Sequence, residues 1–299
     1  MTNNIYLFLY FSLIIDSSII VLMGESERYP ISLNAVNVVC FKIDWDERML
    51  NVLLVKRSIS PYRNKWSLPG GFVQEDETIE EAARRIFIKE TGLTPSYLSQ
   101  FRTYSDTKRD RRLIDNKTEH KARVITTSFT AVYTSDERLR LHEESEDIRW
   151  FKIPRRYLSR YIPEDMAFDH YDILLDTSNR LRISLEYSGI ATRFLPEHFT
   201  LGQIQDIYEI IWEVELDPAN FREKLTNVEG WIKESKSSPI DIEPRRGKPP
   251  TWYKEHDIPQ FDRMISNPNG AVIREKESEY QKELDNLTGE IPIVKKREK

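Results

Sequence analysis

The residues best suited to chemistry lie between positions 70 and 93. A glycine pair, Gly70-Gly71, is followed by a segment that carries Glu77, Arg85 and Glu90. Glycines let the backbone approach a ligand closely, and backbone N–H groups at the start of a helix attract anions. Carboxylates on one helix face can hold a hard divalent cation, which prefers oxygen ligands. The segment could therefore bind an anion, a divalent cation or both.

A helix over this segment brings positions 86, 89 and 90 to one face, because they are three and four residues apart. Only Glu90 is a carboxylate there, and the other two positions hold Ile86 and Lys89. Lys89 places a positive charge roughly where a cation would sit, which repels it. Glu80 and Glu81 could form an improvised metal site, or they simply form an acidic first turn that suits the helix dipole.

The segment resembles the Nudix box, which reads Gly, five residues, Glu, seven residues, then Arg-Glu-hydrophobic-any-Glu-Glu-any-Gly-hydrophobic. The positions in register are Gly71, Glu77, Arg85, Glu90, Gly92 and Leu93. The resemblance implies metal-binding glutamates on the box helix, of which Glu90 remains. We therefore expect weak or absent hydrolysis and no cofactor, with Mg²⁺ needed only for residual hydrolase activity.

The same resemblance implies further roles. Arg85 would pair with Glu77 and hold the box loop. The expected ligand-binding residues are Arg57, Trp66, Gly70 and Gly71. Arg57 could pair with a phosphate, whereas Trp66 could equally be a packing residue.

Composition sets broad limits. The chain has 299 residues, enough for two domains. Its net charge of −5 means that nucleic-acid binding would need a local basic patch. The single cysteine, Cys40, lies in an apolar run and is expected to be a buried strand residue. One cysteine excludes an internal disulfide framework, and the five histidines show no zinc spacing.

Residues 1–30 form an apolar N-terminal extension. The run from Ile5 to Met23 has no Lys or Arg before it, unlike a signal peptide, and Asp16 would be costly inside a membrane. We expect translation to start at Met23, with the first residues an artefact of gene calling. A membrane anchor is the alternative, and no stable membrane partner is expected unless residues 1–22 are translated.

Residues 31–162 predict a mixed β-sheet with helices, an α+β arrangement that fits the Nudix fold. Thr78 is the expected N-cap of the box helix, with Glu81 as its capping-box partner. The charged segment 107–121 is predicted to be a solvated loop, or a loop that reaches a phosphate or DNA. The predicted strands are Ala35–Ile43, Met49–Lys56, Tyr97–Tyr104, Ala122–Tyr133 and Glu146–Lys152.

Residues 163–255 change to a helical pattern. Residues 169–185 show a helical pattern of apolar residues, which the polar residues 176–179 interrupt. Thr200 caps a second helix that ends at Trp212, and Asp217-Pro218 starts a third, an N-cap followed by proline. The apolar stripe of the second helix comprises Leu201, Ile204, Ile207, Tyr208 and Ile211. The short connection is typical of a helix-turn-helix, and a hairpin of residues 231–233 with 250–254 would make it winged. Residues 256–299 are predicted to be a charged, flexible tail.

A second resemblance rests on Leu216-Asp-Pro-Ala-Asn-Phe-Arg-Glu-Lys-Leu225 and Arg246-Gly-Lys-Pro-Pro-Thr-Trp-Tyr253. These segments look like the winged helix-turn-helix of the Nudix-related transcriptional regulators of NAD metabolism. The family implies a bacterial, cytoplasmic homodimer that binds operator DNA and responds to a small nucleotide effector such as ADP-ribose. This chain departs from it in the loop at 107–121, in the longer tail, and at Glu223, where the family has Arg.

Two alternatives to this function remain open. The chain could be an active Nudix hydrolase of ADP-ribose or a related nucleoside diphosphate, with the helical part used for dimerisation. It could also be a sugar-responsive regulator of the same architecture.

The expected DNA-binding residues are Asn220, Arg222 and Lys224 in the third helix, and Arg245, Arg246 and Lys248 at the hairpin tip. Asn and Arg can read adenine and guanine edges in the major groove. Arg and Lys could instead contact phosphate alone, or all six could be ordinary surface residues. Trp212, Phe221 and Leu225 are expected in the core.

Overall fold

The computed structural model describes residues 32–106, 109, 111–115, 120–134, 139–140, 142, 145–154, 161–163, 165–228, 230–235, 250–256 and 265. The predictions for residues 1–30, for the hairpin tip and for most of the tail lie outside this set. No helix among the described residues is long and apolar enough to cross a membrane.

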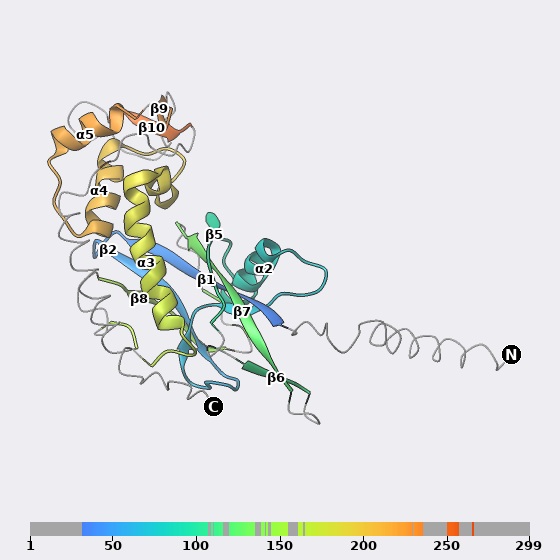
Figure 1. The fold of residues 1–299 in the computed structure, drawn as a ribbon. Coiled ribbons are helices and arrows are strands. Elements are labelled where there is room, and N and C mark those ends of the chain that lie inside the picture. The colour runs from blue at the N-terminus through green and yellow to red at the C-terminus, as the bar shows by residue number, and fades with distance from the viewer. Residues whose placement is uncertain are drawn as a thin grey trace, which may run out of the picture.

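An eight-stranded mixed sheet forms the centre of the molecule (Figure 1). Its main path runs β3 (Trp66–Ser67), β2 (Met49–Arg57), β1 (Ser32–Asp44), β7 (His120–Val132), β5 (Tyr97–Tyr104). Three further strands pair at its sides: β4 (Gly70–Phe72) with β1, β6 (Arg111–Asp115) with β7 and β8 (Ser145–Lys152) with β2. Only β1 and β7 run parallel among the pairs of this described sheet. All five predicted strands are confirmed.

We had predicted a loop over the whole charged segment 107–121, and this prediction is wrong for part of it. Residues 111–115 form β6, which pairs antiparallel with β7. Pairing satisfies the backbone whatever the side chains are, so a strand at the side of a sheet need not show an apolar pattern. Charged residues are common on such strands because they discourage pairing with other chains.

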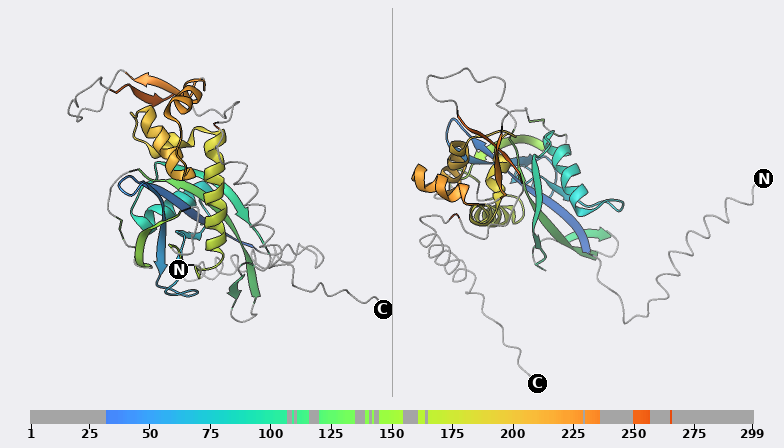
Figure 2. Two further views of the ribbon diagram at one scale, coloured as in Figure 1. Left: turned by 90° about the vertical axis from the view of Figure 1, so that its left-hand side faces the viewer. Right: turned by 90° about the horizontal axis from the view of Figure 1, so that it is seen from above.

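Helices cover both faces of the sheet, as the view from above shows (Figure 2). The side chains of β1 alternate between the faces. Val38 and Cys40 pack with the box helix α2 (Ile79–Thr91), while Val39 and Phe41 face α3 (His170–Tyr187) and α4 (Leu201–Trp212). Cys40 is fully buried, as predicted, and burial raises the pKa of its thiol.

Both ends of α2 are fixed by local interactions. The predicted capping box is present: the Thr78 hydroxyl accepts a hydrogen bond from the Glu81 N–H at 3.2 Å, and the Glu81 carboxylate accepts one from the Thr78 N–H at 2.8 Å. The helix ends at Gly92, whose φ of 71° is left-handed. A Cβ there would lie 2.7 Å from the Cβ of Arg140, so glycine is required for space as well as conformation.

The C-terminal part contains α3, a 3₁₀ helix η2 (Gly189–Phe194), α4, α5 (Pro218–Thr226) and the hairpin β9 (Ile232–Ser235) with β10 (Trp252–Glu255). Helix α3 runs on through residues 176–179, where polar side chains interrupt the apolar pattern. Thr177 and Ser178 are buried, and their hydroxyls donate to the carbonyls of Ile173 and Leu174 at 2.7 Å, so the polar side chains are satisfied within a continuous helix.

The helix-turn-helix and its strand pair form as predicted. Thr200 caps α4 in a capping box, and Asp217 accepts a hydrogen bond from the Asn220 N–H at 2.8 Å at the start of α5. All five residues of the α4 stripe are buried, as are Trp212, Phe221 and Leu225. These residues share one apolar cluster with Val39 and Phe41 of the sheet, so the core continues across the boundary that we had predicted at residue 163.

Candidate ligand site and nucleic-acid interface

A cavity of about 460 Å³ opens between the sheet, the second half of α2 and the start of α3. Three of the predicted ligand residues, Arg57, Gly70 and Gly71, line it. The remaining box residues on its wall are Arg85, Ile86, Lys89 and Glu90. These residues form one wall of the cavity.

Trp66 does not line this cavity, although we had predicted it there. Its ring packs edge-to-face against Phe151, with centroids 4.8 Å apart, and joins the apolar core. The neighbouring Ser67 does line the cavity. Since adjacent side chains in a strand point to opposite faces, Trp66 faces away. It is the packing residue that we had kept as an alternative.

Arg85 and Glu77 form the expected pair. The Arg85 Nε donates to Glu77 at 2.7 Å, and its Nη2 also donates to the Phe72 carbonyl at 3.2 Å. Glu77 further accepts from the Gln74 N–H at 2.8 Å. The hydrogen bond from Arg85 is the largest cause that lowers the pKa of Glu77 to about 2. Both side chains thus hold the loop between β4 and α2.

The cavity wall does not fit a hard divalent cation. Glu90 is the only carboxylate among the described residues that line it. Ile86 is 3 % exposed and Lys89 brings a positive charge. Glu81 is occupied by the helix cap, and neither Glu80 nor Glu81 lines the cavity. No group of three metal-binding side chains gathers anywhere in the described residues.

The opposite wall comes from residues that we had not singled out. Arg109, from the charged segment, lines the cavity and forms a two-pronged ion pair with Asp169, with Nη2 to Oδ1 at 2.8 Å. Its Nη1 donates to Thr126 at 2.6 Å, and its side chain is only 6 % exposed. Asp169 is the residue before α3 and lies sixty positions along the chain from Arg109. Only the fold brings them together.

His170 begins α3 and lines the same cavity. Its Nδ1 accepts a hydrogen bond from the Leu68 N–H at 3.0 Å. Burial lowers the pKa of His170 to about 3, so the ring is neutral at physiological pH. A neutral ring that accepts at Nδ1 carries its proton on Nε2, which makes Nε2 a donor.

Aromatic groups lie at the mouth. The Arg57 guanidinium lies 5.3 Å from the ring centroid of Phe168, and Tyr62 packs against that ring at 4.6 Å. Phe168 has a φ of 57°, which is costly for a bulky residue. Such strain concentrates at functional sites.

The charge balance of the cavity favours anions. Four cationic side chains line it, Arg57, Arg85, Lys89 and Arg109, against the single carboxylate Glu90. Arg85 and Arg109 are neutralised by their partners. Lys89 is exposed and forms no ion pair with any described residue.

The candidate DNA-binding helix α5 presents its predicted residues to solvent. Phe221 and Leu225 are buried against the core, whereas Asn220, Arg222 and Lys224 are exposed. The hairpin-tip residues Arg245, Arg246 and Lys248 lie outside the described part of the chain.

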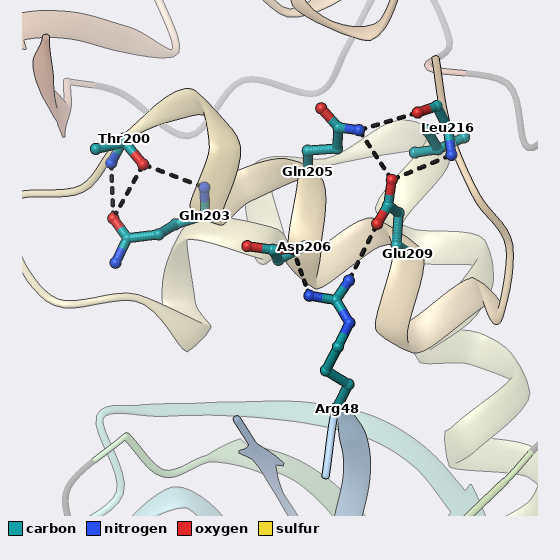
Figure 3. A network of polar contacts seen from close by, with 7 residues as sticks. All are labelled: Arg48, Thr200, Gln203, Gln205, Asp206, Glu209 and Leu216. Atoms are coloured by element: carbon teal, nitrogen blue, oxygen red, sulfur yellow. Dashed lines mark hydrogen bonds and ion pairs between the residues drawn. The ribbon is translucent and has the colours of Figure 1, made fainter. Parts of the chain in front are cut away.

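A polar network connects the sheet to the helix-turn-helix (Figure 3). Arg48, in the turn between β1 and β2, donates to Asp206 at 2.6 Å and to Glu209 at 3.0 Å, both on α4. Glu209 also accepts from Gln205 at 2.8 Å and from the Leu216 N–H at 3.1 Å. Leu216 belongs to the connection before α5, so one carboxylate ties that connection to the sheet.

Two family models match the chain. Residues 33–170 match the NUDIX domain, and residues 191–254 match the NrtR DNA-binding winged helix domain. The Nudix part is 30% identical over 152 residues to the ADP-ribose pyrophosphatase of Methanocaldococcus jannaschii, covering 51% of this chain and 78% of that protein.

Two similar proteins extend over both parts. The ADPR responsive transcriptional repressor NtrR of Acinetobacter baylyi is 29% identical over 250 residues, which cover 82% of this chain and 91% of the relative. The crystal structure of Shewanella oneidensis NrtR complexed with a 27mer DNA has a TM-score of 0.59 at 23% identity, covering 78% of this chain and 99% of that one. The second likeness concerns the fold.

Proposed function

The chain belongs to the Nudix family and carries a winged helix domain of the NrtR type, and from this premise we propose that it is a DNA-binding transcriptional regulator. Its Nudix cavity binds a small nucleotide such as ADP-ribose, the effector class that the name of the Acinetobacter baylyi relative states. The observation that carries the proposal is an anion-attracting cavity, with one carboxylate among its described lining residues, in the same chain as a helix that exposes Arg222 and Lys224.

The cavity has the groups that a nucleoside diphosphate needs. Lys89 and Arg57 suit a diphosphate, and the ring of Phe168 offers a surface for a flat base. Hydrolysis is the less supported function of this cavity. Nudix chemistry generally uses a divalent metal, and Glu90 alone offers too few oxygen ligands to hold one. We propose that ligand binding, and not turnover, is the role of this part.

The winged helix supplies the DNA-binding surface. A helix fits the major groove, and α5 keeps Asn220 and Lys224, one turn apart, on one flank of its exposed surface, with Arg222 on the other. We propose a sensor of residues 31–162, a DNA-binding part of residues 163–255, and a cytoplasmic homodimer that matches a two-fold operator. Arg245, Arg246 and Lys248 would add phosphate contacts.

A DNA-binding titration of the chain against its own upstream region tests the proposal. The double variant Arg222→Ala with Lys224→Ala is expected to lose specific DNA binding, because both substitutions remove a charged side chain from the helix that would enter the groove. The matched control, Arg63→Ala with Arg84→Ala, removes the same charge from exposed residues of the Nudix part and should bind normally. Equal affinities for the two double variants would refute the assignment of α5.

The same titration tests the effector. Specific binding should depend steeply on salt, as phosphate contacts do, and should shift when ADP-ribose is added. Binding that is specific but indifferent to ADP-ribose would retain the regulator and direct the search to sugar effectors. No specific binding, together with metal-dependent hydrolysis of ADP-ribose, would overturn the proposal.

A further inference from the structure

The deep end of the cavity contains a buried polar group without a partner. Asn37, on β1, lines the cavity and is 1 % exposed. Neither atom of its carboxamide finds a hydrogen-bond partner in the described structure. A buried polar group left unpaired costs about 1–3 kcal/mol, so such groups are rare and usually have a functional reason.

Ser128 lies beside Asn37 in the sheet. The strands β1 and β7 run parallel and place the two residues in register, so their side chains leave the sheet on the same face. Ser128 is fully buried and does not itself line the cavity, and its hydroxyl also lacks a partner among the described residues. Two neighbouring strands therefore offer unsatisfied, uncharged hydrogen-bonding groups at one spot.

The space beside Asn37 is kept open by glycine. Gly70 pairs with Asn37 from the other side, on β4. A Cβ on Gly70 would lie 2.9 Å from the Val36 carbonyl oxygen and 3.3 Å from the Cβ of Asn37. Any other residue would crowd the strand pair at this point.

Two more groups border this recess. Thr126 lies two residues before Ser128, on the same face of β7, and lines the cavity. His170 lines the cavity from α3 and presents a neutral ring with its proton on Nε2. The cationic side chain Lys89 projects from α2 on the opposite wall.

We propose that Asn37 and His170 form a subsite for the vicinal hydroxyls of a ribose ring, while Lys89 and Arg57 hold the phosphate end of the same ligand. The inference rests on the proposed function and specifies the ligand class as a phosphorylated or diphosphate-linked ribose. A hydroxyl is both donor and acceptor, as is the carboxamide. Asn37 and His170 are uncharged, and the Arg109 guanidinium beside Thr126 is already neutralised by Asp169. The recess therefore suits neutral hydroxyls, because a phosphate pushed into it would find no free counter-charge.

Calorimetric titration of the full chain with ADP-ribose, ADP, ribose 5-phosphate and pyrophosphate tests the subsite. Asn37→Ala is expected to weaken the binding of ribose 5-phosphate and ADP-ribose about five- to tenfold, and to leave the binding of pyrophosphate unchanged. The unfolding temperature of this variant should not fall, since no protein hydrogen bond is lost. A structural role would instead lower stability and weaken all the ligands together.

A matched control is Asn51→Ala. Asn51 is also a buried asparagine with an unpartnered carboxamide oxygen, but it lies on β2 and does not line the cavity. It should leave every affinity unchanged. The titration with ADP shows which ribose of ADP-ribose occupies the recess. Weaker binding of ADP to Asn37→Ala identifies the ribose of the nucleoside. Unchanged binding of ADP identifies the terminal ribose.

The outcomes separate this inference from the proposed function. ADP-ribose that binds Asn37→Ala as tightly as the unaltered protein would refute the subsite and leave the regulator intact. If ribose 5-phosphate binds and Asn37→Ala weakens that binding, while ADP-ribose does not bind at all, the subsite would be supported and the proposed nucleotide effector refuted. No binding of either compound would refute the subsite.

Discussion

Removal of the Arg48 side chain is expected to loosen the connection between the sheet and the helix-turn-helix. Arg48 reaches two carboxylates of α4, and its side chain is 50% exposed, against 36% for Asp206 and 18% for Glu209. Exposed ion pairs contribute about 0.2–1 kcal/mol each. The Asp206 pair belongs at the low end of that range and the more buried Glu209 pair at about 1 kcal/mol.

A double-mutant cycle isolates the second value. Arg48 has a φ of 50°, so replacing it also changes the cost of a left-handed backbone. Combining Arg48→Ala with Glu209→Gln cancels that cost, because it enters both arms of the cycle. Glutamine keeps an oxygen that can accept from the Leu216 N–H. Urea unfolding followed by tryptophan fluorescence should give a coupling energy of about 1 kcal/mol at low salt.

Salt provides the second criterion. At about 1 M salt the screening length falls to roughly 3 Å, and the coupling energy should shrink to a fraction of its low-salt value. A coupling below about 0.2 kcal/mol at low salt, or one that salt does not change, would show that the network of Figure 3 does not connect the two parts.

Two further predictions concern the cavity. His170 has a pKa near 3 in the folded protein against an ordinary 6.5, so below pH 6.5 the unfolded chain gains a proton that the folded chain cannot accept. The contribution of His170 to the free energy of unfolding should be fully present above pH 6.5 and should fall towards pH 3 by at most about 5 kcal/mol. The urea midpoint of His170→Gln should therefore decline less steeply with falling pH than that of the unaltered protein. Identical declines would contradict the neutral ring. Lys89→Glu adds a second carboxylate beside Glu90 and should create millimolar Mn²⁺ binding that calorimetry detects. The unaltered protein and the control Lys89→Met should show no such binding. Micromolar Mn²⁺ binding by the unaltered protein would contradict our description of the site.

Local signals explain what could be predicted from the sequence. The capping residues Thr78, Thr200 and Asp217 each act within three positions of themselves, and all three caps form. The apolar stripe of α4 repeats at helical spacing and is buried throughout. Short-range chemistry of this kind is visible in one sequence because the partners are neighbours along the chain.

The missed residues depend on contacts that span the chain. Arg109 looked like part of a solvated charged segment, yet Asp169 and Thr126 hold it in the cavity wall. The hydrogen bond from the Leu68 N–H to His170 crosses 102 positions. Asn37 was hidden because its strand reads as an apolar run, and a lone asparagine there carries no periodic signal. Tertiary contacts, and not local propensity, create this half of the site.

Helix α3 connects the cavity to the helix-turn-helix. Its first turn supplies His170 to the cavity, and Asp169 just before it holds Arg109. Near its other end, the carbonyls of Arg182 and Leu185 accept hydrogen bonds from Trp212 at 3.0 Å and Tyr208 at 2.9 Å, both on α4. A rigid helix transmits a shift of one end to the other, and packed cores change between discrete arrangements. A ligand at His170 can therefore move α4 only if it binds one placement of α3 more tightly than another.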